Sequence, residues 1–169
     1  ASNHRTDNFG GSAENRIRFP VMVLQAMADA IGADRVGLRF SPGNPYNGMD
    51  VSDPEATFIP LLKAIAELDL AYLHVLDMGL SGLDTLAMVR ENNATPIIVN
   101  NMLTADTGRA IINAQRADAV SFGRAFIANP DLPMRFLRNL PLATGDEATY
   151  YGGAERGYTD YARADGTPA

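Results

Sequence analysis

The sequence contains no cysteine and only two histidines, His4 and His74. Without cysteine there can be no disulfide framework, no thiolate nucleophile and no thiolate metal site. Two isolated imidazoles also leave little from which to build a metal centre or a serine–histidine pair. The sequence therefore disfavours metal catalysis and nucleophilic hydrolysis, and we expect no metal site.

Positive charge and long apolar runs are scarce as well. The formal net charge is −6 and the pI is near 4.8, whereas a nucleic-acid surface needs clustered lysine and arginine. No apolar run approaches the roughly 20 residues that cross a bilayer, and the polar start, ASNHRTDNFGG, holds no signal core. We therefore expect a cytoplasmic protein that binds neither nucleic acid nor membrane. With 46% apolar residues, the chain has the composition of one globular domain, residues 1–169.

Helical and extended patterns alternate along the chain. Helical patterns predict helices at 12–31, 52–68, 83–91 and 105–116. Short β-branched or aromatic runs predict strands at 35–41, 71–77, 96–101 and 118–123. Ser12 fits the N-cap of the first helix, and Ser52 with Glu55 fits a capping box at the second. Because each crossover must return over a sheet face, this alternation predicts parallel strands covered by helices.

The motifs of doubly wound nucleotide-binding folds are absent, since the sequence has neither GxGxxG nor GxxxxGK[ST]. We therefore predict an α/β chain of the (β/α)8 TIM-barrel type. A complete barrel has eight strands and takes about 250 residues. Four strands in 169 residues predict a half-barrel.

Gly123 and Arg124 end the last predicted strand, and their pairing has two interpretations. A glycine can simply let two backbones approach, beside an ordinary exposed arginine. The pair can also form an anion site, because glycine admits a phosphate close to the main chain and the guanidinium forks onto its oxygens. In such barrels a phosphate commonly lies between the loops after the last two strands, here 100–103 and 123–126.

Arg39 is a second candidate, near the C-terminal end of the first predicted strand. It alternates with Val36, Leu38 and Phe40, so it faces the barrel lumen if those three side chains pack under helices. A buried arginine needs an anionic or multi-acceptor partner, because an unpaired buried charge is costly. An ion pair with Asp77 is the alternative interpretation of Arg39.

Several long motifs resemble one family in the correct order and spacing. They are SNHRTDNFGGSAENRIRF, DRVGLRFSP, ADAVSFGRAFIANPDLP and YYGGAERGYTDY, and they resemble the C-terminal half of the Old Yellow Enzyme family, the FMN-dependent ene-reductases. The resemblance covers essentially the whole chain. It implies an eight-stranded barrel with FMN at its C-terminal mouth. It also implies that NADPH or NADH reduces the FMN and that an activated alkene reoxidises it.

The resemblance assigns expected roles to single residues. Arg39 resembles the arginine that contacts flavin N1 and the C2 carbonyl, where its charge would stabilise the anionic reduced flavin. Gly123 and Arg124 resemble the phosphate clamp, and the backbone of Asn101 and Met102 resembles the other phosphate loop, so these five positions are expected to bind cofactor. In YYGGAERGYTDY, Tyr151 resembles the tyrosine near flavin and substrate, and it is the expected catalytic residue.

The chain departs from the family in two places. The family often has glycine where residues 100–102 (NNM) stand, so bulkier side chains line this approach to the phosphate. Ala162 replaces the family's usual proline, which loosens the tail. The family's substrate-anchoring histidine pair and proton-donating tyrosine belong to the N-terminal half, and neither histidine here matches them. We expect His74 to be a hydrogen-bonded core histidine and His4 to be structural or exposed.

Two hypotheses of function remain open. The chain is either the flavin-holding half of an ene-reductase that works with a complementary N-terminal half-barrel, or a non-catalytic half-barrel that self-associates. Two open sheet edges and an exposed lumen face favour burial against a partner in both cases. The residues that would discriminate between the hypotheses lie outside this sequence.

Overall fold

The computed structural model describes residues 2–49, 53–79, 82–100, 102–152 and 154–167. The chain divides into two compact units, Ala1–Val120 and Ser121–Ala169. The first unit contains the sheet and four helices, and the second contains two short helices and a long C-terminal segment. No helix of the described residues is long and apolar enough to cross a membrane.

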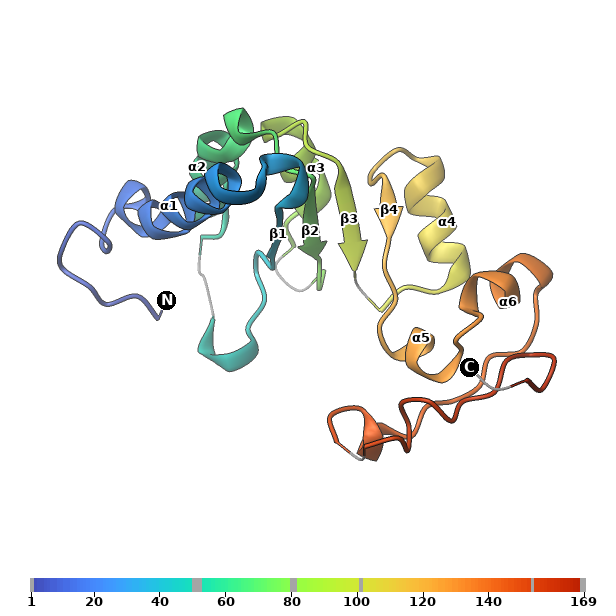
Figure 1. The fold of residues 1–169 in the computed structure, drawn as a ribbon. Coiled ribbons are helices and arrows are strands. Elements are labelled where there is room, and N and C mark those ends of the chain that lie inside the picture. The colour runs from blue at the N-terminus through green and yellow to red at the C-terminus, as the bar shows by residue number, and fades with distance from the viewer. Residues whose placement is uncertain (1, 50–52, 80–81, 101, 153, 168–169) are drawn as a thin grey trace. The chain divides into compact units, whose positions relative to one another are not determined.

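The first unit is built on a parallel four-stranded sheet (Figure 1). Its strands lie in chain order, β1 Gly37–Phe40, β2 Tyr72–Leu76, β3 Ile97–Asn100 and β4 Ala119–Val120. Each strand pairs in parallel with the next, and the rows are in register, for example Arg39 with His74. This sheet confirms the four predicted parallel strands. β4 is shorter than the predicted segment 118–123, since it has a ladder partner on one side only, and Gly123 already caps the next helix.

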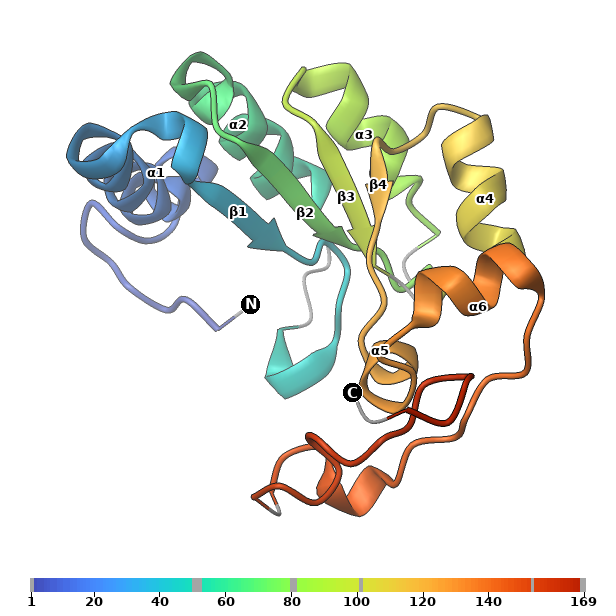
Figure 2. The same cartoon turned by 45° about the vertical axis from the view of Figure 1, so that its right-hand side comes forward.

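One helix precedes the first strand and three connect successive strands, and in Figure 2 these four helices lie along one side of the sheet. They are α1 Ala13–Ile31, α2 Glu55–Ile65, α3 Thr85–Asn92 and α4 Ala105–Asn113. The Ser12 side chain caps α1 by accepting a hydrogen bond from the Asn15 N–H, as predicted. Ser52 lies outside the described residues; Asp53 accepts the Ala56 N–H at 3.0 Å at the start of α2. These caps satisfy amide groups that the first helical turn leaves without a partner.

The core lies between the helices and one face of the sheet. Every second strand residue points into it, including Phe40, Leu73, Val75, Ile97 and Val99. Helix α2 contributes three buried side chains, Leu61, Leu62 and Ile65. Its Phe58 ring also stacks on Phe40, with 5.7 Å between the ring centroids. The alternation of buried and less buried residues along β2 and β3 follows the two-residue period of a strand.

The opposite face of the sheet carries the remaining strand residues and is not covered by helices in the first unit (Figure 2). Arg39, His74 and Asn100 lie on this face. Ile98 is the register partner of His74 on β3, and Asn100 follows it two residues later on the same strand. It is the face that lines the lumen when such a sheet closes into a barrel. The polar residues of the strands therefore gather where the helices are absent.

The second unit packs α5 Arg124–Ala128 and α6 Leu132–Arg138 around a small core. Ala128, Asn129 and Leu132 are buried there, and Phe122 meets Phe136 edge to face at 5.1 Å between centroids. After α6 the chain runs through residues 139–167 with a single 3₁₀ turn among its described residues, Glu147–Thr149. Turns and side-chain hydrogen bonds, rather than a sheet, therefore order this segment.

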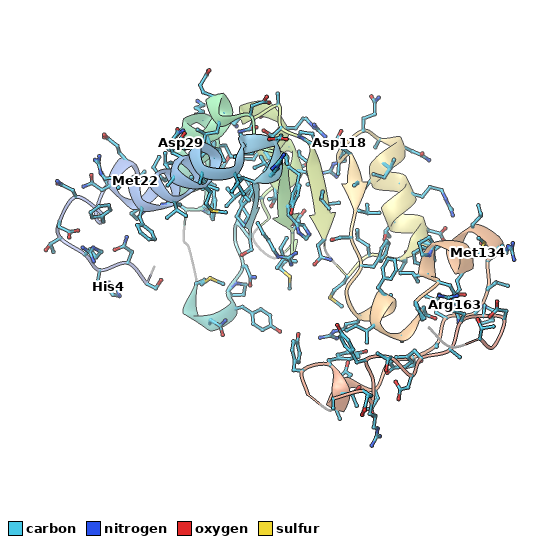
Figure 3. The ribbon with its side chains drawn as sticks, viewed as in Figure 1. His4, Met22, Asp29, Asp118, Met134 and Arg163 are labelled. Carbon is cyan, nitrogen blue, oxygen red and sulfur yellow. The ribbon has the colours of Figure 1, made fainter. Side chains whose placement is uncertain are left out.

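Asp118, labelled in Figure 3, joins β3 to the start of β4. Its Oδ2 accepts the Ile97 backbone N–H at 2.7 Å and a hydrogen bond from Arg90 Nη2 at 2.8 Å. The Ile97 hydrogen bond, and after it the Arg90 guanidinium, hold the pKa of Asp118 below its ordinary value of 3.8. The ionised carboxylate therefore stabilises the folded sheet.

Replacing Asp118 by asparagine should lower stability in a way that depends on pH. Because the folded pKa lies below the unfolded value, the carboxylate stabilises the fold above pH 3.8 and loses this effect as the pH falls through the folded pKa. Urea midpoints of the native chain and Asp118→Asn should differ at pH 7 and converge at the lowest pH where the chain stays folded. Asp106→Asn, which changes an exposed aspartate, is the control. If the difference in urea midpoint between the native chain and Asp118→Asn is the same at every pH, the lowered pKa of Asp118 is contradicted.

Candidate functional site

The candidate residues are divided between the two units. Arg39 and Met102 lie in the first unit, while Gly123, Arg124 and Tyr151 lie in the second. Asn101, predicted to contribute its backbone to a phosphate loop, lies outside the described residues. Each group is therefore described within its own unit.

Arg39 lies on the uncovered face of the sheet and contacts two polar neighbours there. Its Nη1 lies 2.9 Å and 3.0 Å from the two ring nitrogens of His74, on the adjacent strand, and its Nη2 donates to Asn100 Oδ1 at 3.4 Å. A guanidinium only donates, so the ring nitrogen that receives its hydrogen bond must be unprotonated. The three side chains form a polar row across β1, β2 and β3.

The charge state of His74 follows from its surroundings. Burial, and after it the positive charge of Arg39, lowers the pKa of His74 from its ordinary value of 6.5. His74 is therefore neutral at pH 7 and can accept the Arg39 hydrogen bond. It lies on the polar face, opposite Leu73 and Val75, so the expectation of a core histidine is corrected: His74 is hydrogen-bonded but does not belong to the helix-covered core.

Two further expectations for Arg39 are corrected. Its position on the face opposite Phe40 is as predicted, but the side chain is exposed rather than buried, because the helices of the first unit cover only the other face. The alternative partner Asp77 is engaged elsewhere, accepting hydrogen bonds from the Gly79 N–H at 3.0 Å and from Thr85 Oγ1 at 3.4 Å. Arg39 thus carries its charge among neutral groups.

Met102 follows β3 in an unusual backbone conformation. Its φ is 31°, in the left-handed region that glycine occupies without strain. Its side chain is 90% exposed, so packing does not hold it there. Met102, one of the three residues 100–102 where glycine was expected from the family resemblance, therefore has a backbone conformation that glycine adopts without strain.

Gly123 and Arg124 mark the start of α5 in the second unit. A Cβ added to Gly123 would meet no described atom within 4 Å, so close backbone approach within the described chain does not require this glycine. Arg124 Nη1 pairs with Glu147 Oε1 at 3.4 Å, and both side chains are about three-quarters exposed, 76% and 75%. Of the packing interpretation, the close approach at Gly123 has no support among the described residues, whereas the exposed arginine is as that interpretation expects.

Tyr151 lies two residues beyond the Glu147–Thr149 turn, and its side chain is fully exposed. Asp146 organises the turn: its Oδ1 accepts the Ala148 N–H at 3.1 Å, and its backbone N–H donates to the Tyr161 hydroxyl at 2.7 Å. The same loop therefore carries Tyr151 and the carboxylate that pairs with Arg124.

Sequence reasoning missed several of these groups. The row formed by Arg39, His74 and Asn100 had a signal, because each is the polar residue of an apolar strand at an alternating position. Glu147, the partner of Arg124, had none, since the two residues lie 23 positions apart with two short helices and irregular chain between them. His4, labelled in Figure 3, lies in the exposed N-terminal segment, in agreement with the expectation.

Comparison with known proteins places this arrangement in a family. Residues 1–143 match the model of the NADH:flavin oxidoreductase / NADH oxidase family. The chain belongs to this family. Two solved members have closely similar structures. A point mutant of morphinone reductase in complex with tetrahydroNAD is 41% identical with a TM-score of 0.92. The Old Yellow Enzyme homologue of Zymomonas mobilis is 37% identical with a TM-score of 0.90. The two alignments cover 97% and 95% of this chain. They confirm the Old Yellow Enzyme resemblance.

The extent of the match confirms the half-barrel. A chanoclavine-I aldehyde reductase of Penicillium roqueforti is 38% identical over 95% of this chain but only 47% of its own length. The two solved structures are likewise covered over 45% and 47% of their chains. The chain thus spans less than half the length of these family members and supplies four strands of a TIM-barrel fold.

Replacing Met102 should test the glycine-like backbone of this family loop. Met102→Gly should leave the free energy of unfolding nearly unchanged, because relief of a left-handed conformation, about 1 kcal/mol, offsets the extra entropy of an unfolded glycine. Met102→Val should destabilise by about 1 kcal/mol or more, since a β-branched side chain fits this region poorly. Urea unfolding measures both, and equal effects of glycine and valine would contradict the assigned backbone.

Proposed function

We propose that this chain is the FMN-holding half of an ene-reductase that transfers a hydride from NADPH or NADH, through FMN, to an activated alkene. The observation that carries the proposal is the row of Arg39, His74 and Asn100 on the open face of a half-barrel sheet of this family. When bound, FMN supplies the hydride chemistry, and the chain supplies binding, orientation and charge.

The residues of the open sheet face fit a flavin. Arg39 donates hydrogen bonds, and within the described part of the chain its contacts are the neutral His74 ring and the Asn100 amide rather than a carboxylate. A flavin ring edge rich in carbonyl and nitrogen acceptors is a suitable ligand for such a guanidinium. His74, kept neutral, would support the orientation of Arg39 without adding a second positive charge.

The start of α5 fits a phosphate in the same proposal. Gly123 leaves open space where any other residue would place a Cβ, and Arg124 presents an exposed guanidinium next to it. A phosphate would accept charge-assisted hydrogen bonds from Arg124 and would replace Glu147, whose exposed pair with Arg124 contributes little stability. Binding would thus exchange one anionic partner of Arg124 for another.

The partner in this proposal is a complementary N-terminal half-barrel. α1 exposes a continuous apolar face, whose members are between 39% and 63% exposed: Phe19, Met22, Val23, Met27 and Ile31. These residues recur at helical spacing, and together with the buried Ile17 and Leu24 they make an apolar arc wider than a one-sided surface helix needs. β1, which follows α1, is an edge of the described sheet. A preceding βα unit would cover both, as TIM-barrel topology requires.

Reconstitution tests the function directly. The purified chain is mixed with FMN and the N-terminal half of a full-length relative, and oxidation of NADPH or NADH is followed in the presence of an enone. Retained yellow colour with turnover supports the proposal. A colourless, inert oligomer instead supports the non-catalytic, self-associating alternative.

A matched pair of variants on α1 tests the partner surface in the same mixture. Met27→Asp places a charge in the exposed apolar face and should weaken association with the added half about tenfold or more, because an ionised group resists burial. Gln25→Glu, on the polar side of α1, should have little effect. Analytical ultracentrifugation measures both, and equal association of the two variants would contradict this docking surface.

Arg124 should discriminate FMN from riboflavin, which lacks the phosphate. Arg124→Ala should weaken FMN binding by about 10- to 100-fold, the value of one or two charge-assisted hydrogen bonds, while riboflavin binding changes little. Flavin fluorescence quenching measures both ligands. Arg138→Ala, which removes an exposed arginine from α6, is the control, and an equal loss for FMN and riboflavin would reject the phosphate role of Arg124.

A further inference from the structure

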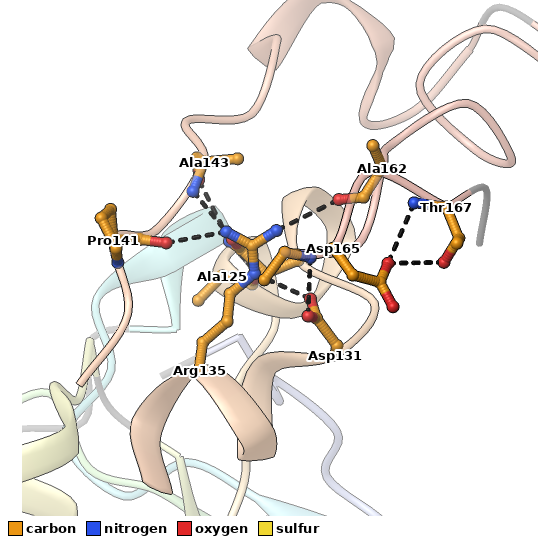
Figure 4. A network of polar contacts seen from close by, with 10 residues as sticks. Ala125, Asp131, Arg135, Pro141, Ala143, Ala162, Asp165 and Thr167 are labelled. Carbon is orange, nitrogen blue, oxygen red and sulfur yellow. Dashed lines mark hydrogen bonds and ion pairs between the residues drawn. The ribbon is translucent and has the colours of Figure 1, made fainter. Parts of the chain in front are cut away.

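Within the second unit, the C-terminal loop that carries Glu147 and Tyr151 leaves the α5–α6 core and returns to it at one place (Figure 4). The outgoing segment is Pro141–Ala143 and the returning segment is Ala162–Ala164. We call these two segments the neck of the loop. Three side chains from the stretch 129–135 bind the neck, and all their contacts lie within the second unit.

Arg135 binds both segments of the neck with one guanidinium. Its Nη1 donates to the Pro141 carbonyl at 2.7 Å, and its Nη2 donates to the Ala162 carbonyl at 3.1 Å. Its Nε donates to Asp131 Oδ1 at 2.7 Å, one helical turn earlier. The residue is only 8% exposed, which is unusual for arginine and requires these partners. The planar fork of donors therefore joins two segments that lie 21 residues apart at their contact points, Pro141 and Ala162.

Asp131 and Asn129 complete the arrangement. Asp131 Oδ2 accepts the Ala164 N–H at 2.9 Å on the returning segment, and the hydrogen bond from Arg135, followed by that from Ala164, lowers the pKa of Asp131. Asn129, fully buried, exchanges two hydrogen bonds with the Ala143 backbone, at 2.7 Å and 3.1 Å, on the outgoing segment. Each side of the neck is thus held by more than one side chain.

The loop beyond the neck has no regular secondary structure except one 3₁₀ turn among its described residues, and local hydrogen bonds such as that from the Asp146 N–H to the Tyr161 hydroxyl order it. Its ion pair between Arg156 and Asp146 is exposed, and Tyr151 at its far end makes no packing contact that would bury it. A loop without regular structure gains most of its order from the fixing of its ends, because end fixation removes a large part of its conformational entropy. The position of Glu147 and Tyr151 therefore depends on the neck.

We propose that Asp131 and Arg135 are positioning residues that close this neck and thereby set the placement of Tyr151 and of the Glu147 partner of Arg124. Neither residue would touch flavin or alkene; they act through the loop. The functional consequence rests on the function proposed above, whereas the closure of the neck does not.

Hydrogen–deuterium exchange on the 169-residue chain alone tests the closure. Arg135→Lys and Asp131→Asn each keep part of the hydrogen bonding, so the unit should remain folded. Both should accelerate exchange of the amides of residues 144–161 about tenfold, while the amides of α5 and α6 keep their protection. The control Arg138→Lys changes an exposed arginine of the same helix and should leave the loop unchanged.

Trypsin gives a second measure of the same opening. Arg156 is the one tryptic site between residues 144 and 161, so cleavage there should rise about tenfold in the two neck variants if opening gates it. Unchanged exchange and cleavage would overturn the proposal. A general loss of protection through α5 and α6 would also overturn it, because the pair would then hold the whole unit and not the loop.

Kinetic measurements distinguish a failure of the neck closure from a failure of the proposed function. In the reconstituted protein, Arg135→Lys should raise KM for the enone about tenfold with a smaller change in kcat, as expected when a substrate-side group is displaced. If the loop loosens but neither Arg135→Lys nor Tyr151→Phe changes the kinetics, the role of Tyr151 in the proposed function fails, and so does the functional half of this inference. If the loop does not loosen, the neck closure fails while the proposed function stands.

Discussion

The one-sided covering of a short parallel sheet is the constraint on which the first unit depends. Strand side chains alternate between two faces, and helices α1 to α4 cover only one of them. Apolar residues such as Leu73 and Val75 must therefore occupy the covered face, and polar residues of the same strands are confined to the other. Parallel pairing in register places His74 beside Arg39, whereas Asn100 pairs with Leu76 and reaches Arg39 through its side chain from the same face of β3.

Two arginine–carboxylate pairs in the second unit show how burial decides what such a pair does. The Arg135–Asp131 pair has side chains only 9% and 16% exposed and is supported by backbone carbonyls and an amide, so removal of one member would leave unpaired groups inside the unit. The Arg124–Glu147 pair is exposed on both sides and longer, 3.4 Å against 2.7 Å. Water can replace either member of the exposed pair at little cost, so Arg124 can take another partner. The buried pair instead holds the surrounding backbone in place.

Local sequence patterns predicted the four strands, helices α1 to α4 and the face on which Arg39 lies, because these features depend on residues a few positions apart; the short helices α5 and α6 were not predicted. The exposure of Arg39 could not be predicted in this way, since it depends on whether another layer covers the sheet. The contacts of Arg135 with Ala162 and of Asp131 with Ala164 join residues 27 and 33 positions apart through irregular chain. No hydrophobic period marks such contacts, although the FGRAFIANPDLP motif contains Asn129 and Asp131.

Arg39 also differs from most other arginines of this chain, whose net charge is −6, in the groups that it contacts. Within the described residues, nine arginines form ion pairs with aspartate or glutamate. Arg39 contacts a histidine kept neutral by burial and an asparagine instead. Its field is therefore not cancelled locally, and an electron-rich ligand could approach it without displacing a carboxylate. Arg124 differs from Arg39 in this respect, because an anion that binds Arg124 must first displace the Glu147 carboxylate.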